Sequence, residues 1–144
     1  SGHCIENDLN SYSYYATPTI LVIEEHEILR ETLTTMLSLQ GYRAIAASNG
    51  ATGVGYALCE YPDLIICDVQ LSCLNGFQVF SAVRCNPKTK HIPMIVLTAC
   101  IYEDIRLQAI NLGVDAYLFK PCPFTTLLSE IERCLMRSSQ LLLS

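Results

Sequence analysis

Apolar and polar positions follow two different rhythms along the chain from residue 19 onward. Short apolar runs of strand length are separated by longer segments with helical spacing, which is the pattern of β-α-β units on a parallel sheet. Three runs are almost continuously apolar, as expected for strands covered by helices on both faces, whereas the second and fifth are weaker and suit sheet edges. In chain order the runs are TILVIE (19–24), RAIAAS (43–48), DLIICD (63–68), PMIVLT (93–98) and DAYLFK (115–120).

The segments between the runs predict helices. Gly41 and Gly113 mark two helix ends, because glycine commonly closes a helix. A helix from about Asn49 to Glu60 contains two further glycines, each of which costs about 1 kcal/mol relative to alanine. We expect one open, doubly wound parallel sheet with right-handed crossovers and helices on both faces. Apolar residues recur at helical spacing at Leu29, Leu33, Met36 and Leu37, at Ile101, Ile105, Ala109 and Leu112, and at Phe124, Leu127, Leu128, Ile131 and Leu135.

The composition narrows the class of protein. A chain of 144 residues with 51% hydrophobic and 16% charged residues fits one globular domain. Fourteen acidic residues against nine basic ones argue against direct nucleic-acid binding. There is no secretory segment or apolar stretch of membrane-spanning length, so we expect a cytoplasmic protein without membrane contact. The eight cysteines lack metal-ligand spacing, and we expect most of them to be small buried hydrophobes.

The chain divides into three parts in this interpretation. Residues 1–18 have no periodicity and read as a tail or linker that begins with a cloning scar, Ser1-Gly2-His3. Residues 19–137 form the domain. Residues 138–144 are a C-terminal tail or the start of a linker to a missing output domain, and the apolar LLL near the end mildly favours the linker.

Polar residues end the apolar runs. Glu24 and Glu25 follow the first run, Asp68 the third, Thr98 the fourth and Lys120 the fifth. Because parallel strands all point the same way, these residues gather at one edge of the sheet, where ligands of such folds bind. One polar strand end is ordinary, but three carboxylates together repel each other unless cations balance them. Lys120 supplies one positive charge, and a divalent ion such as Mg²⁺, with a phosphoryl group, would complete the site.

Residues 19–137 resemble a receiver domain of the response regulators of two-component signalling. The resemblance implies a flavodoxin-like sheet of five strands in the order 2-1-3-4-5, and phosphoryl transfer from a histidine kinase or phosphotransfer protein onto an aspartate. It implies a signalling switch that controls an output domain or protein, not an enzyme beyond autocatalytic phosphorylation and dephosphorylation; a homodimer stays open. The motifs that carry it are the Glu24-Glu25 pair, "DLIICDVQLSCLNGFQVF" with Asp68 eight residues before Gly76, "PMIVLTA" with Thr98-Ala99, and "DAYLFKP" with Tyr117, Lys120 and Pro121.

The resemblance also implies residue roles. Asp68 is the phosphoacceptor and a ligand of Mg²⁺ or another divalent cation. Glu25 is the second carboxylate ligand, Glu24 acts mainly through water, and the Gln70 backbone carbonyl completes the protein's share of the metal shell.

The remaining roles concern the phosphoryl group and the switch. Thr98, Ala99 and Lys120 surround the phosphoryl group, and a cis peptide to Pro121 holds the lysine in place. Thr98 and Tyr117 form the switch pair, in which the hydroxyl moves toward the phosphate and the aromatic ring turns inward. Phosphorylation then biases an existing two-state equilibrium.

The sequence departs from the family pattern at three positions. Glu25 stands where aspartate is most common, and its extra methylene alters the geometry that Mg²⁺ demands. Ser72 replaces a common proline and loosens the loop, and Asn75 replaces a common aspartate but keeps the chemistry of a helix start. His26 reads as a solvated helix-start residue rather than a ligand.

The sequence also bears on three other functions. The Glu24-Glu25 pair leaves a pseudo-receiver open, a protein-interaction module with weak or no phosphorylation. An aspartyl phosphatase is disfavoured because Gln70 stands where such enzymes place a second acid. A nucleotide-binding dehydrogenase is disfavoured because the turn EEHEIL after the first run contains no glycine.

Overall fold

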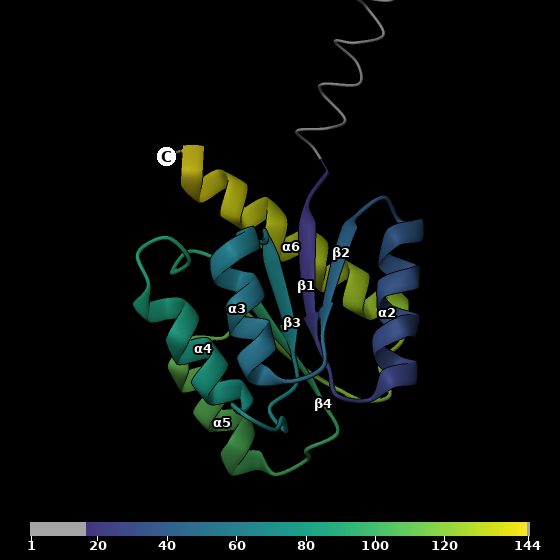
Figure 1. The fold of residues 1–144 in the computed structure, drawn as a ribbon, viewed down its shortest axis with the longest axis vertical. Coiled ribbons are helices and arrows are strands. Elements are labelled where there is room, and N and C mark those ends of the chain that lie inside the picture. Colours follow the sequence, from purple (N-terminus) through teal and green to yellow (C-terminus); the bar gives the residue numbers. More distant parts are fainter. Residues whose placement is uncertain (1–16, 144) are drawn as a thin grey trace, which may run out of the picture.

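The computed structural model describes residues 17–143, so residues 1–16 of the predicted tail at 1–18 lie outside the described part. Five parallel strands form one sheet in the order β2-β1-β3-β4-β5, which confirms the predicted topology and the two edge strands (Figure 1). The register is continuous, with Ile20 beside both Ala44 and Leu64. The strands are β1 (Thr19–Ile23), β2 (Arg43–Ala47), β3 (Leu64–Cys67), β4 (Met94–Thr98) and β5 (Ala116–Phe119).

Helices cover both faces of this sheet. Helices α2 and α6 pack on one face, and α3, α4 and α5 pack on the other (Figure 1). Side-chain caps define the starts of two helices: Asn49 accepts from the Thr52 N–H at 2.9 Å, and Asn75 forms a reciprocal capping box with Gln78. The helices are α2 (Glu27–Leu39), α3 (Gly50–Glu60), α4 (Gly76–Cys85), α5 (Glu103–Leu112) and α6 (Phe124–Leu143).

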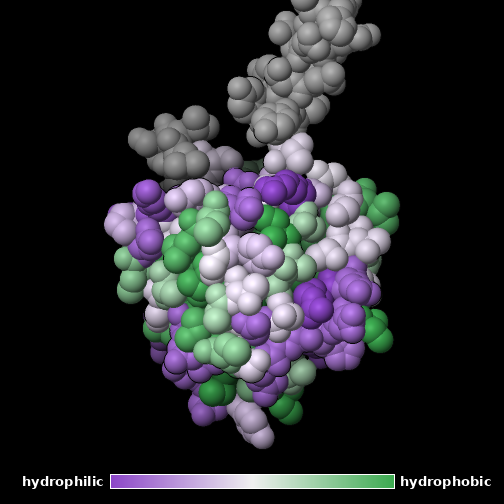
Figure 2. Space-filling model, in the orientation of Figure 1, coloured by the Kyte–Doolittle hydropathy of each residue, from purple (hydrophilic) through white to green (hydrophobic). Residues whose placement is uncertain are grey.

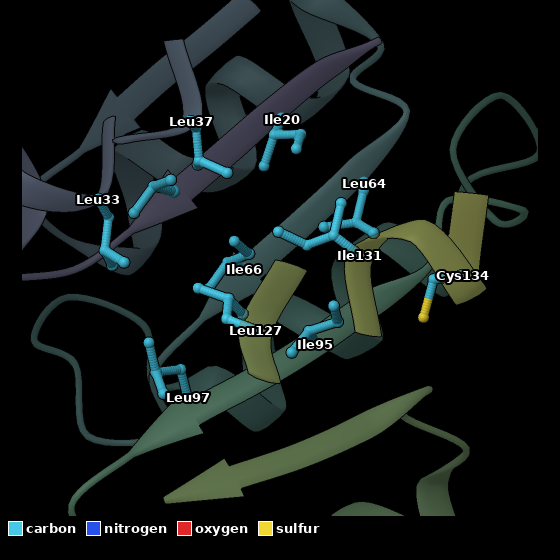
Figure 3. Packing of buried hydrophobic residues seen from close by; sticks show 11 residues of the cluster. Ile20, Leu33, Leu37, Leu64, Ile66, Ile95, Leu97, Leu127, Ile131 and Cys134 are labelled. Carbon is cyan, nitrogen blue, oxygen red and sulfur yellow. The ribbon is translucent and has the colours of Figure 1, made fainter. Parts of the chain in front are cut away.

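Successive strand residues point to opposite faces and fill separate cores. In β1, Ile20 and Val22 pack beneath α2 and α6, whereas Leu21 and Ile23 pack beneath α3 and α4. Figure 3 shows the first of these cores, in which Leu127 and Ile131 of α6 lie against the strand residues. All six of these side chains are at most 1% exposed. This two-sided burial explains the continuous apolar runs of the central strands.

Gly53 of α3, predicted to weaken its helix, has a packing role. A Cβ at this position would lie 2.4 Å from the side chain of Ile23, so the glycine lets α3 approach β1 closely. Gly55 has no such neighbour within 4 Å.

A polar network joins four elements at the amino end of the sheet. The Asp115 carboxylate accepts from the Met94 N–H at 2.8 Å and pairs with Arg84 at 3.4 Å. Arg133 of α6 donates to the Asp115 backbone oxygen at 2.8 Å, and Arg84 donates to the Ile92 carbonyl. The network therefore connects α4, β4, β5 and α6.

Three details differ from the sequence-based expectations. Ile101 lies before α5 and is 78% exposed, so it does not belong to the apolar helix face predicted for it. Helix α6 continues to Leu143, past Arg137 where we expected the domain to end.

The third difference concerns the cysteines. Of the seven in the described part, only Cys67, Cys100 and Cys134 are buried, so the expectation that most are core residues is wrong. Cys59 and Cys85 lie on outward faces of helices, where helical position and not residue type decides exposure. All seven are free thiols.

The molecular surface mixes residue types. On the face shown in Figure 2, hydrophobic residues are interspersed with hydrophilic ones. Within residues 17–143, no helix combines the length and the apolar character needed to cross a membrane.

Candidate functional site

The carboxyl ends of four strands bring the predicted residues together at one edge of the sheet, the lower end in Figure 1. Glu24 follows β1, Asp68 follows β3, Thr98 ends β4 and Lys120 follows β5. Because β1, β3 and β4 are neighbours and β5 is next to β4, residues far apart in sequence meet here. Such edges hold the ligand sites of open α/β sheets.

Lys120 joins the two buried carboxylates. Its Nζ lies 2.5 Å from Glu24 Oε1 and 2.7 Å from Asp68 Oδ2, and the carboxylate residues are only 5% and 6% exposed. Burial lowers the pKa of Lys120, but its hydrogen bonds and attraction to Asp68 and Glu24 outweigh this, and the pKa is raised overall. Lys120 is therefore a protonated ammonium at neutral pH. The peptide bond from Lys120 to Pro121 is cis.

The Asp68 carboxylate is also held by the loop that follows it. Oδ1 accepts a hydrogen bond from the Gln70 N–H at 3.0 Å. The loop returns at Gly76, whose N–H donates to the Val69 carbonyl at 3.1 Å. A Cβ at Gly76 would lie 2.5 Å from the Asp68 backbone oxygen, so only glycine permits this approach.

Glu25 does not join this pair. Its carboxylate is exposed and accepts a hydrogen bond from the Ser72 backbone N–H. Hydrogen bonding to Ser72 lowers the pKa of Glu25, against the opposing effects of desolvation and of the nearby Asp68 charge. The Arg30 guanidinium donates to the backbone carbonyls of Glu24 and Glu25 at 2.9 and 3.0 Å, which fixes the turn after β1.

The two residues predicted to switch lie on neighbouring strands. Thr98 is fully buried, and its Oγ1 accepts from the Cys100 N–H at 3.2 Å. The Tyr117 hydroxyl is a buried side-chain oxygen without a hydrogen-bond partner within the described chain, and burial raises its pKa. The Tyr117 ring packs edge-on to Phe119 at 5.4 Å. Ala99, between Thr98 and Cys100, is exposed.

His26 is the N-cap of α2. Its Nδ1 accepts from the Leu29 N–H at 3.3 Å, and its own N–H donates to Glu24 Oε2 at 3.0 Å. The histidine therefore lies at the helix start, as the sequence predicts.

The donor set fits a hard divalent cation in its chemistry. Two carboxylates contact one ammonium, and the Glu25 carboxylate next in the chain adds a third negative charge, so the region has excess negative charge. Its ligand atoms are oxygens, which Mg²⁺ prefers. Across residues 17–143, however, no three His, Cys, Asp or Glu side chains are already grouped to hold a metal ion. Glu25 must turn away from Ser72 to join the other two carboxylates.

A separate apolar groove borders the site. It has a volume of about 540 Å³ and lies between α2 and the start of α6. Lys120 and Pro121 form part of its wall, but neither Glu24 nor Asp68 does. The groove therefore shares Lys120 with the charged site but not the two buried carboxylates.

Fold and site together define a flavodoxin-like α/β protein with an acidic, lysine-containing edge. A family profile described as the response regulator receiver domain matches residues 20–132. The chain belongs to this family, whose members are signalling proteins of two-component systems.

Individual relatives agree with this membership. The chain is similar to Protein PilH of Pseudomonas aeruginosa, with 33% identity over 116 residues that cover 81% of this chain and 96% of PilH. It is also similar to the transcriptional regulatory protein PcoR of Escherichia coli, with 35% identity over 83% of this chain. The match covers 52% of PcoR, so the chain spans about half the length of this and other regulators.

A solved structure shows the same fold. The receiver domain of sensor histidine kinase PA1611 from Pseudomonas aeruginosa superposes with a TM-score of 0.76 and 26% identity, covering 83% of this chain and 98% of that one. That protein was crystallised with a magnesium ion coordinated in its active-site cleft.

Two contacts of the site were not predicted from the sequence. Arg30 belongs to no strand end, and the only hint of its contact with the preceding loop is a basic residue at the end of the first turn of α2. Ser72 was noted as a replacement for proline, but not as a hydrogen-bond donor to Glu25.

Proposed function

We propose that this chain is a phosphorelay receiver that accepts a phosphoryl group on Asp68 and changes conformation to control an output partner. The observation that carries the proposal is the contact between the Lys120 ammonium and the Asp68 carboxylate in a chain of the receiver family. The relatives named above give no support to the pseudo-receiver alternative.

The transfer is a displacement at phosphorus. A carboxylate oxygen of Asp68 attacks the phosphohistidine of a histidine kinase or phosphotransfer protein. The new oxygen–phosphorus bond forms as the phosphorus–nitrogen bond breaks, and the leaving imidazole nitrogen keeps the electron pair and binds a proton. A charged Lys120 beside Asp68 stabilises the negative oxygens of the transferred group.

The other residues have positioning roles in this proposal. The Gln70 N–H orients the Asp68 carboxylate, and Thr98 and Ala99 border the bound phosphoryl group. Glu24, Glu25, Asp68 and the Gln70 carbonyl would hold Mg²⁺ or another divalent cation, which neutralises charge as the phosphoryl group arrives.

The response to phosphorylation involves Thr98 and Tyr117. Thr98 Oγ1 exchanges its bond with the Cys100 N–H for one to a phosphoryl oxygen. The vacated space and the unpaired Tyr117 hydroxyl bias β5 and the neighbouring α5 toward a second arrangement. An output domain or partner protein reads this change.

A small phosphodonor tests the function directly. With Mg²⁺ and acetyl phosphate, we expect the wild-type mass to increase by one phosphoryl group and Asp68→Asn to stay unmodified. Beryllofluoride with Mg²⁺ should shift the amide NMR signals of Thr98 and Tyr117 in wild type only. Labelling that persists in Asp68→Asn, or no labelling of wild type, contradicts the assignment.

A further inference from the structure

We infer that the backbone N–H of Ser72 is a positioning group that competes with a bound divalent cation for the Glu25 carboxylate. This inference rests on the proposed function, because it concerns the cation site of the proposed phosphoacceptor. In this inference, the loop after β3 determines how readily Glu25 becomes a ligand of the cation.

Glu25 is free to move only in its side chain. Arg30 donates from one nitrogen to the carbonyls of Glu24 and Glu25, at 2.9 and 3.0 Å, so the main chain at this turn is fixed. The Glu25 side chain is exposed and hydrogen-bonds to Ser72, through both its backbone N–H and its side chain. Rotation about the side-chain bonds of Glu25 therefore decides where its carboxylate lies.

The Ser72 N–H is presented from an equally fixed loop. The Ser72 carbonyl accepts from the Gly50 N–H at 3.2 Å and from the Leu74 N–H at 2.8 Å. A Cβ at Gly50 would lie 1.8 Å from the Leu74 backbone oxygen, so this glycine lets the start of α3 pack directly on the loop. Ser72 is thus held by two hydrogen bonds to its carbonyl, while its N–H, which belongs to the preceding peptide group, faces Glu25.

The two positions of Glu25 exclude each other. With its carboxylate on Ser72, Glu25 is not grouped with Glu24 and Asp68 as a set of three metal-binding carboxylates in the described chain. A carboxylate that moves to join them gives up the Ser72 hydrogen bond. The free energy of cation binding is therefore less favourable by the free energy of that hydrogen bond.

Residue 72 offers a matched pair of variants for this competition. Ser72→Pro removes the backbone N–H, whereas Ser72→Ala removes the hydroxyl and keeps the N–H. Glu25→Asp shortens the side chain by one methylene, which breaks the reach to Ser72 while the main chain stays fixed by Arg30.

Calorimetric titration with Mg²⁺ then gives a double-mutant cycle. We expect Ser72→Pro to bind Mg²⁺ about fivefold more tightly than Ser72→Ala, the size expected for loss of one competing hydrogen bond. In the Glu25→Asp background the ratio of the two affinities should fall to about one. Equal or weaker binding by Ser72→Pro overturns the inference, and so does an unchanged ratio with Glu25→Asp, because proline would then act through loop stiffness.

Wild-type protein supplies a second readout that needs no substitution at residue 72. Hydrogen exchange of the Ser72 amide, followed by NMR, should speed up severalfold at saturating Mg²⁺ and also in metal-free Glu25→Ala. The exposed Glu27→Ala is the control and should leave it unchanged. A Ser72 amide that stays equally protected at saturating Mg²⁺ refutes the competition.

The two proposals fail in different ways. Absence of phosphorylation on wild-type Asp68 contradicts the proposed function, whatever the Ser72 variants do. If Asp68 is phosphorylated but the hydrogen-exchange rate of the Ser72 amide changes neither with Mg²⁺ nor in Glu25→Ala, only the competition is contradicted.

Discussion

Replacing Lys120 by methionine gives the sharpest test of the electrostatics at the strand ends. Methionine keeps a long unbranched side chain but removes the ammonium that contacts both Glu24 and Asp68. Both carboxylate oxygens lie within 2.7 Å of Lys120 Nζ. They are therefore at most about 5 Å apart, which corresponds to roughly 3 kcal/mol of repulsion at an effective dielectric constant of about 20.

We expect Lys120→Met to lower the free energy of unfolding at neutral pH by about 2 to 3 kcal/mol, because removing one partner leaves buried carboxylates uncompensated. Urea unfolding followed by circular dichroism measures this, since the chain has no tryptophan. Lys90→Met, which removes an exposed lysine of the turn before β4, is the control and should change little.

The pH dependence has a definite sign. The stabilisation by the Lys120 ammonium depends on the proton that it carries, so it changes only where that proton is lost. Wild-type Lys120 has a raised pKa, so its stabilisation is complete below the unfolded value of about 10.4 and is lost only as pH rises through the folded value. The difference in stability between wild type and Lys120→Met should therefore be the same at about pH 7 and at about pH 9, both below that unfolded value.

Two results would refute this reasoning. One is a Lys120→Met protein as stable as the Lys90→Met control at neutral pH. The other is a difference in stability that is already smaller at about pH 9 than at about pH 7, since Lys120 would then lose its proton below the unfolded value of its pKa.

Three further predictions concern packing and exposure. Gly76→Ala should destabilise the protein in urea unfolding by at least about 2 kcal/mol, because the new Cβ would lie 2.5 Å from a backbone oxygen. Gly55→Ala, at a helix position with no neighbour within 4 Å, is the control and should stabilise the protein by up to about 1 kcal/mol. Tyr117→Phe should stabilise the unmodified protein by about 1 kcal/mol in the same assay, because it removes an unpaired buried hydroxyl; a loss of stability would show that the hydroxyl has a partner. Burial raises the pKa of Cys134 to about 11, so iodoacetamide at about pH 8 should label exposed Cys59 and spare Cys134, as peptide mass mapping would show.

The sheet was predictable because its signal is long and repeated. Each central strand is apolar on both faces, and the order of runs and helical segments leaves few topologies for a parallel sheet. Gly53 shows the limit of local propensity, because its cost to the helix is offset by the close approach to Ile23. Cys59 shows another limit, since a small residue type fits either face of a helix.

The site was predictable only where strand direction decides position. Glu24, Asp68 and Lys120 meet because their strands end at the same edge, and this requires no knowledge of side-chain torsions. The orientation of Glu25 depends on a backbone N–H four residues beyond Asp68, and a sequence pattern of side chains does not record such donors. The contact made by Arg30 escaped prediction for a similar reason, because its acceptors are main-chain carbonyls.

The polar network around Asp115 has a consequence for how the helices can move. Arg84, in the last turn of α4, is tied to Asp115 and to the Ile92 carbonyl, whereas the first turn of α4 touches the Asp68 loop through Gly76. Because α4 is held at its last turn, a small displacement of Gly76 would tilt the helix about Arg84. A change in the Asp68 loop would then displace the first turn of α4 most and its last turn least.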